Sequence, residues 1–76
     1  STDLEGTIQV SSLEAISGAL KLVTIPWGFY KPLYRVRVPA GVRQGTRLRL
    51  SGMGRMDPDT GRKGDLFLTV DIKNAL

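Results

Sequence analysis

Two short runs of alternating apolar and arginine residues, joined by a loop that holds proline and glycine, constrain the fold of this chain most strongly. The runs cover residues 34–38 (YRVRV) and 47–50 (RLRL), and the loop contains Pro39, Gly41 and Gly45. In both runs the apolar side chains recur at every second position, which is the period of a half-buried strand and not of a helix. The sequence therefore predicts two strands, each with an arginine face, and a stiff connection between them.

The same period predicts three further strands, over residues 4–10, 19–25 and 65–73. The inward-facing side chains of the first and last of these are expected to be Leu4, Ile8 and Val10, and Leu66, Leu68, Val70 and Ile72, with Phe67 on the opposite face. The strand at 19–25 has apolar side chains on both faces. We therefore expect it to be covered on one side and to line a groove on the other.

Residues 11–18 (SSLEAISG) interrupt the strand pattern and predict one short helical turn. A serine serves as the N-cap, Glu14 lies in the first turn, and Gly18 ends the turn in a left-handed conformation. Leu13 and Ile16 are three residues apart and so share one face of a helix. We expect these two side chains to hold the turn against the core.

Five strands, one helical turn and no internal repeat predict an all-β fold, a small two-sheet β-sandwich or partly open barrel. A chain of 76 residues encloses a single core, so residues 1–76 are expected to form one domain. The chain starts at Ser1 without a methionine. We therefore expect a domain excised from a longer protein.

The chain contains no cysteine and no histidine, which excludes disulfides, thiol nucleophiles and imidazole acid–base chemistry, and leaves zinc without its usual ligands. The carboxylates form no catalytic motif. Residues 57–61 (DPDTG) do not continue as a calcium loop, because Leu68 stands where a bidentate glutamate is needed. We expect no enzyme, no cofactor and no metal site.

The composition also bears on location. Absent cysteine fits a reducing compartment, and no apolar run approaches the roughly 20 residues of a membrane-spanning helix. We expect a cytoplasmic protein without a membrane partner.

A net charge of +4 and the arginines of the two alternating runs raise the possibility of a nucleic-acid partner. Arg35, Arg37, Arg47 and Arg49 would form the cationic stripe of a small nucleic-acid-binding β-barrel, and the aromatic residues at 27–30 a stacking platform. Outward arginines also keep strands in solution and discourage edge pairing. Tyr34 alternates to the opposite face of its strand, so we favour this second interpretation and treat nucleic-acid binding as the alternative.

The strand at 19–25 is the other candidate site. Lys21, Val23 and Ile25 alternate on one of its faces, beside Ile8 of the first strand. A peptide could add here as an extra strand and insert its apolar side chains. The alternative is an ordinary covered core face, which the residues by themselves favour.

Two longer motifs resemble a known family. They are PAGVRQGTRLRLSGMG at residues 39–54 and GDLFLTV at residues 64–70, and they follow the 11–18 segment in a fixed order. Together they resemble the first C-terminal, substrate-binding domain of DnaJ-type co-chaperones, over nearly the whole chain. The resemblance implies a β-sandwich that holds hydrophobic segments of unfolded polypeptides in a shallow groove by strand addition.

The resemblance also implies partners and site residues. The partner is a DnaK-type chaperone, whose acidic C-terminal tail approaches a lysine in some family members. The positions of this sequence that match the peptide-binding groove are Ile8, Lys21, Val23, Ile25 and Leu68. Lys21 would pair with a carboxylate, and the other four would be apolar walls.

The chain departs from the full family pattern in three respects. The short segment at residues 27–32 stands where a zinc-binding module is inserted in some members, which resembles the zinc-free class. The J-domain, the second C-terminal domain and the dimerisation helix do not occur in these residues, so we expect a monomer or weak dimer that does not itself stimulate the partner's ATPase. Val23 replaces a phenylalanine of some members and changes the expected depth of the groove.

Overall fold

The computed structural model describes residues 2–24 and 33–74, and its elements follow the predicted order. They are β1 (Leu4–Ser11), α1 (Ser12–Ser17), β2 (Ala19–Thr24), β3 (Leu33–Val38), β4 (Arg47–Leu50) and β5 (Leu66–Lys73). Five strands in two sheets and one short helix confirm the predicted all-β sandwich.

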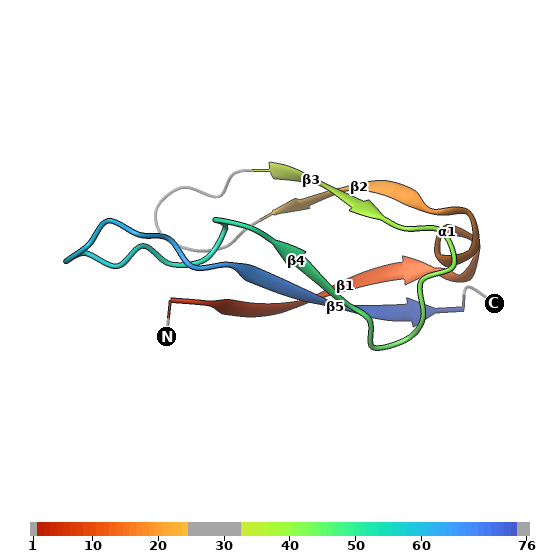
Figure 1. The fold of residues 1–76 in the computed structure, drawn as a ribbon. Helices are drawn as coiled ribbons and strands as arrows, with labels where there is room; N and C mark the ends of the chain where they lie inside the picture. Colours follow the sequence, from red (N-terminus) through yellow and green to blue (C-terminus); the bar gives the residue numbers. More distant parts are fainter. Residues whose placement is uncertain (1, 25–32, 75–76) are drawn as a thin grey trace.

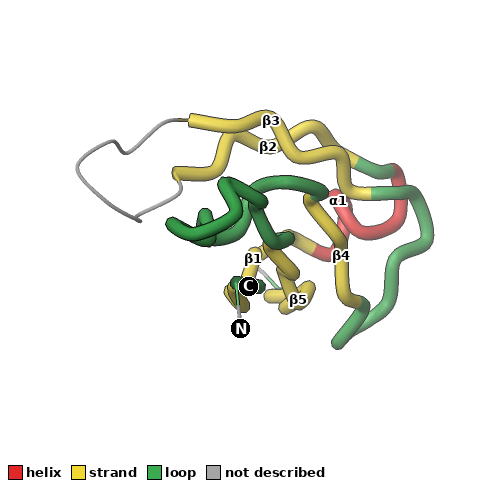
Figure 2. Tube along the Cα trace, turned by 60° about the vertical axis from the view of Figure 1, so that its left-hand side comes forward, coloured by secondary structure: helices red, strands yellow, loops and turns green. Residues whose placement is uncertain are grey.

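The strands divide into a three-stranded sheet, in the order β1-β5-β4, and a two-stranded ribbon, β2-β3. The ribbon lies over the three-stranded sheet as a second layer (Figures 1 and 2). The first and last strands, β1 and β5, pair in parallel, and β4 pairs antiparallel with β5. The two alternating runs, now β3 and β4, therefore belong to different sheets, and the loop at 39–46 crosses from one layer to the other.

The core fills the space between the two layers and uses the side chains that alternate inward from each strand. Its buried members are Leu4, Ile8, Val10, Ala15, Val36, Val38, Leu66, Leu68 and Val70. The predicted inward faces of β1 and β5 are thereby confirmed, with Ile72 packed against the cluster at the end of β5. Phe67 lies on the opposite face, as expected, under the guanidinium of Arg47.

The prediction that Leu13 and Ile16 hold α1 against the core is wrong. Leu13 is 73% exposed and Ile16 is 71% exposed, whereas Ala15 is buried. The helix has only six residues, so the strands at its two ends fix its rotation, and the small Ala15 faces the core. Gly18, which follows the helix, has φ 80° and ψ 158°, an extended conformation at positive φ and not the left-handed helical conformation that the sequence predicts.

The predicted exposed loop between β4 and β5 is a long projection at the end of the molecule opposite α1 (Figure 1). Met56 and Lys63 form an isolated antiparallel bridge within it. The backbone N–H of Arg55 donates to the carbonyl oxygen of Thr2 at 2.7 Å, which ties the base of the loop to the start of the chain. The described part of the molecule is elongated, with extents of 47 × 20 × 16 Å.

Candidate functional site

The capping of α1 determines where β2 starts and where Lys21 lies. Ser11 is the N-cap: its hydroxyl oxygen accepts from the Glu14 N–H at 3.1 Å, and Glu14 Oε1 accepts from the Ser11 N–H at 2.8 Å. This reciprocal pair is a capping box, which satisfies two N–H groups at the helix start. After the helix, Gly18 turns the chain directly into β2. A residue with a side chain would be crowded at this position, because an added Cβ would lie 3.1 Å from both the Ala40 nitrogen and the Val38 oxygen.

Lys21 connects β2 to both α1 and β1. Its Nζ donates to Glu14 Oε1 at 2.9 Å and to the backbone carbonyl oxygen of Gln9 at 2.7 Å. The Lys21 side chain is 27% exposed and that of Glu14 is 34% exposed, so solvent still reaches the pair. The pKa of Glu14 lies below its ordinary value, first because the Ser11 N–H donates to the carboxylate and then because Lys21 does. The carboxylate and the ammonium group therefore face each other as charged groups.

Three of the other predicted site residues, Ile8, Val23 and Leu68, point into the space between the two layers. Ile8 is 4% exposed and Leu68 is 3% exposed, and both are core residues of the three-stranded sheet. Val23 lies half-buried on the inner face of the ribbon and packs against the same core. Ile25 lies outside the described residues. The structure thus groups Val23, Ile8 and Leu68 around one hydrophobic cluster, with Lys21 beside it.

Each of the strands β1 and β2 has one edge without a described partner. Within residues 2–24 and 33–74, β1 pairs only with β5 and β2 pairs only with β3. The Lys21 hydrogen bond to the Gln9 carbonyl spans from one of these strands to the other. Unpaired strand edges carry free backbone donors and acceptors, and such edges accept an added strand.

The four arginines of the alternating runs do not form one stripe. Arg35 and Arg37 lie on the outer face of the ribbon, whereas Arg47 and Arg49 lie on the outer face of the three-stranded sheet, on the other side of the core. Because the two pairs belong to opposite faces of the sandwich, the cationic surface considered from the sequence is divided.

Arg47 and Arg49 are also engaged within the chain. Arg47 Nη2 donates to both carboxylate oxygens of Glu5, at 2.6 and 2.8 Å, while its guanidinium lies 4.4 Å from the centre of the Phe67 ring. Arg49 Nε donates to Asp65 Oδ2 at 2.7 Å. The pKa of Asp65 is lowered, first by the hydrogen bond from the Gly52 N–H and then by Arg49. Both arginines therefore already have a carboxylate partner within the chain.

The described residues contain no group of three or more acidic, cysteine or histidine side chains that could hold a metal ion. Asp57 instead stabilises the turn of the projecting loop, because its Oδ1 accepts from the Asp59 N–H at 2.9 Å. None of the described helices has the length and apolar character needed to span a bilayer.

Sequence reasoning missed the two partners of Lys21. The pattern Ser11-x-x-Glu14 is visible as a capping box in the sequence and places the Glu14 carboxylate at the helix start. That this carboxylate also meets Lys21, together with the Gln9 carbonyl, depends on how β1 and β2 are brought together by α1. No local pattern carries this information.

Comparison with known proteins assigns the family. Residues 4–75 match the DnaJ C terminal domain. The chain is 34% identical to a DnaJ-like protein of Synechocystis and 36% identical to the chaperone protein DnaJ of Thermosipho africanus, in each case over 92% of this chain and 20% or 18% of the relative. It is 49% identical to a curved DNA-binding protein of Pseudomonas putida over 57% of this chain and 14% of that protein.

The chain thus spans about a fifth or less of the length of these relatives. The family match covers nearly all of the sequence, agrees with the two motifs at 39–54 and 64–70, and supports the expectation that the chain is not an enzyme. The chain belongs to the DnaJ C-terminal domain family, a non-enzymatic family of chaperone domains.

Proposed function

We propose that this domain binds exposed hydrophobic segments of unfolded polypeptides, which add as an extended strand along the free edge of β2. The observation that carries the proposal is that edge, which lacks a described partner and lies beside Lys21 and the hydrophobic cluster. Membership of the DnaJ C-terminal domain family supports the chaperone role. Backbone hydrogen bonds from the β2 edge would supply affinity without regard to client sequence.

The side chains of the bound strand would supply selectivity. Alternate residues of an added strand point to one face, and those directed inward would meet Val23 at the margin of the core. Ile8 and Leu68 are almost fully buried, so in this proposal they form the floor under Val23 once the client separates the layers locally. Ile25 lies outside the described residues, and its inclusion in the proposed groove rests on the alternation of Lys21, Val23 and Ile25 in the sequence.

Lys21 would act as an exchangeable cation. In the unbound domain it donates to Glu14 and to the Gln9 carbonyl, and a client or partner carboxylate would replace the first of these contacts. Solvent reaches this partly buried pair, and ion pairs in contact with solvent contribute only about 0–1 kcal/mol, so we expect this exchange to cost little. The acidic C-terminal tail of a DnaK-type chaperone is the partner we propose for Lys21.

The remaining parts of the proposal rest on the sequence. The chain has no cysteine, which supports assignment to the zinc-free class and a location in the reducing cytoplasm. The short match to each relative supports a single peptide-binding domain within a longer co-chaperone. As an isolated domain we propose a monomer or weak dimer.

Backbone amide shifts during titration with an acetylated, uncharged hydrophobic peptide test the proposed groove. We expect shifts concentrated in β2 and in the Gln9 region of β1, and loss of these shifts in Val23→Asp.

Titration with an acidic peptide tail tests Lys21. Lys73→Ala is the matched control for Lys21→Ala, because Lys73 is also ion-paired but lies on β5. If saturating concentrations of the uncharged hydrophobic peptide produce no backbone amide shifts in β2, the proposed groove is overturned.

A further inference from the structure

The outer face of the β2–β3 ribbon carries three of the exposed large hydrophobic side chains in the described part of the chain. Leu20, Leu22 and Leu33 are 58%, 66% and 63% exposed. In the register of the ribbon, Leu20 stands opposite Arg37 and Leu22 opposite Arg35, so each arginine has a leucine as its cross-strand neighbour. This face is therefore apolar and cationic at once, and it is directed away from the core and from the inner face that carries Lys21 and Val23.

The arginines on the outer face of the three-stranded sheet have carboxylate partners, which Arg35 and Arg37 lack in the described part of the chain. Arg47 and Arg49 alternate along β4 as Arg35 and Arg37 alternate along β3, and each receives a carboxylate of this chain, Glu5 or Asp65. Among the described residues no carboxylate forms an ion pair with Arg35 or Arg37. On the outer face of the three-stranded sheet both arginines of β4 are ion-paired. On the outer face of the ribbon the two arginines of β3 lack an ion-pair partner among the described residues and lie next to exposed leucines.

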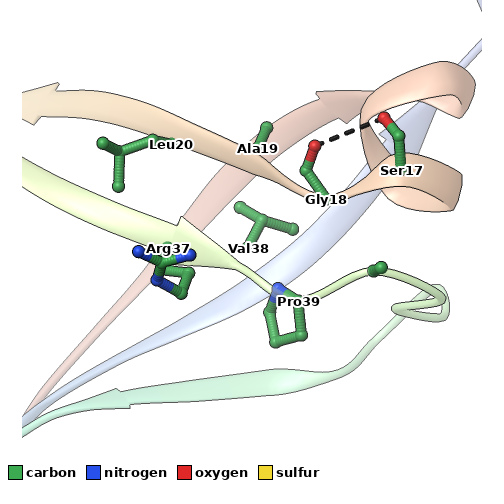
Figure 3. Close-up of a pocket in the computed structure, with 8 residues that line it drawn as sticks. Ser17, Gly18, Ala19, Leu20, Arg37, Val38 and Pro39 are labelled. Atoms are coloured by element: carbon green, nitrogen blue, oxygen red, sulfur yellow. Dashed lines mark hydrogen bonds between the residues drawn. The ribbon is translucent and has the colours of Figure 1, made fainter.

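A shallow hollow of about 450 Å³ lies at the α1 end of the ribbon. Leu20 and Arg37 line it together with the backbone turn at Gly18 and the ring of Pro39 (Figure 3). An apolar wall, a guanidinium and a rigid turn therefore meet at one place. The hollow can receive the side chain of a segment that lies along the face.

We propose that the outer face of the β2–β3 ribbon is a second docking surface, which binds an extended acidic polypeptide segment. Along β3 the exposed row reads Leu33, Arg35, Arg37, and alternate side chains of a strand are spaced by about 6.5–7 Å. A segment with one apolar residue followed by acidic residues two and four positions later has the same spacing. Its carboxylates meet Arg35 and Arg37, and its apolar side chain packs on Leu33 and Leu22.

Charge and side-chain type together favour an acidic peptide over a second copy of this chain and over single-stranded nucleic acid. A second copy of the ribbon would bring arginine against arginine, which is repulsive. Single-stranded nucleic acid relies on aromatic side chains for base stacking, and the only aromatic residue of the described part of the ribbon, Tyr34, alternates to the inner face. An acidic peptide supplies both the carboxylates and the apolar contact that the face lacks.

The experiment is a titration of the 76-residue chain with an acetylated, amidated peptide that carries leucine and then glutamate two and four positions later, followed by backbone amide shifts. We expect shifts at Leu20, Leu22 and residues 33–37. The double variant Arg35→Glu/Arg37→Glu should weaken binding by about tenfold or more. The matched control is Arg62→Glu/Lys63→Glu, which makes the same charge change on the projecting loop and should leave the site-specific shifts in place.

Further titrations distinguish binding at this surface from binding elsewhere on the chain. An uncharged hydrophobic peptide should bind the double variant as it binds the native chain, so the groove at Lys21 and the outer face succeed or fail independently. Equal loss in both charge-reversal variants would mean non-specific attraction and overturn the proposal. Preferential binding of a single-stranded oligonucleotide at the same arginines, or concentration-dependent dimerisation through this face, would also overturn it.

Discussion

Gly54 is, with Gly64, one of two glycines in the described part of the chain at which an added Cβ would lie less than 3.0 Å from backbone atoms of another segment. Its N–H donates to the Gly64 carbonyl oxygen at 2.9 Å. A Cβ on Gly54 would lie 2.5 Å from the Thr2 oxygen, 2.6 Å from the Gly64 carbonyl carbon and 2.7 Å from the Asp65 nitrogen. These are backbone atoms on two different segments, so none of them can move aside independently. The glycine allows the start of the chain and both strands of the projecting loop to meet.

Gly54→Ala is therefore expected to destabilise the fold by about 1–3 kcal/mol, as overpacking of a tight site does. Gly6→Ala is the matched control, because the added Cβ there would meet only the end of the Leu68 side chain, at 3.0 Å. Leu68 is 3% exposed, so its side chain must shift within the core, but alanine is preferred over glycine in a strand by about 0.5–1 kcal/mol. This variant should therefore lose less stability than Gly54→Ala. Urea unfolding measures the free energy of unfolding of both variants. A smaller loss of stability in Gly54→Ala than in Gly6→Ala would contradict this explanation.

At the scale of elements, α1 links three parts of the molecule despite its six residues. The capping box holds its start against β1, Ala15 enters the core, and Glu14 pairs with Lys21 of β2. The N–H of Gly41 also donates to the Ala15 carbonyl oxygen at 2.8 Å, which attaches the crossing loop to the helix. Glu14 is thus both a helix cap and a contact between strands.

This dual role predicts an acid-dependent loss of stability. The pKa of Glu14, ordinarily 4.5, and those of Asp65 and Asp71, ordinarily 3.8, are all lowered in the folded chain. Groups with a lowered folded pKa stabilise the fold above their ordinary pKa, and the stabilisation is lost as pH falls through the folded value. Stability should therefore decline below about pH 4.5.

Glu14→Gln isolates the contribution of the helix. We expect its free energy of unfolding to be lower than that of the native chain at pH 7, and the difference to be smaller at pH 3, because the stabilisation is lost as pH falls through the lowered folded pKa of Glu14. Denaturant unfolding at the two pH values measures this. A constant difference between the native chain and the variant would contradict the role of the Glu14 charge.

At the scale of the whole molecule, two thin layers share one small core. A domain of this size typically has a folding stability of roughly 0.05–0.15 kcal/mol per residue, or about 4–11 kcal/mol in all. Nine side chains form the buried core in the described residues. Each of these buried side chains consequently contributes a large part of the folding free energy, whereas side chains on the outer faces contribute little.

Leu66 and Leu22 provide a matched pair for this difference. Leu66 is 1% exposed and Leu22 is 66% exposed. We expect Leu66→Ala to destabilise the domain by about 2–5 kcal/mol, because it removes buried methyl groups and leaves a cavity. Leu22→Ala should change stability by no more than about 0.5 kcal/mol, as exposed substitutions do. Thermal and denaturant unfolding compare the two, and equal losses would mean that Leu22 is covered in solution.

The sequence by itself determined the strands and the direction of their side chains. Alternation is a local property, because successive side chains of a strand point to opposite faces, and it predicted correctly that Leu68 and Val70 face inward and Phe67 outward. The motifs at 39–54 and 64–70 were sufficient for the family, which the family match confirms.

Only the tertiary structure decided which strands pair and what each face meets. The parallel pairing of β1 with β5 joins the two ends of the chain, and the placement of β3 and β4 in different sheets divides the arginines into a paired set and an unpaired set. The same packing turns Ala15 inward in place of Leu13 and Ile16, and brings Lys21 to Glu14 and Gln9. These outcomes depend on contacts between residues far apart in the sequence, and a periodic pattern specifies the direction of a side chain but not its partner.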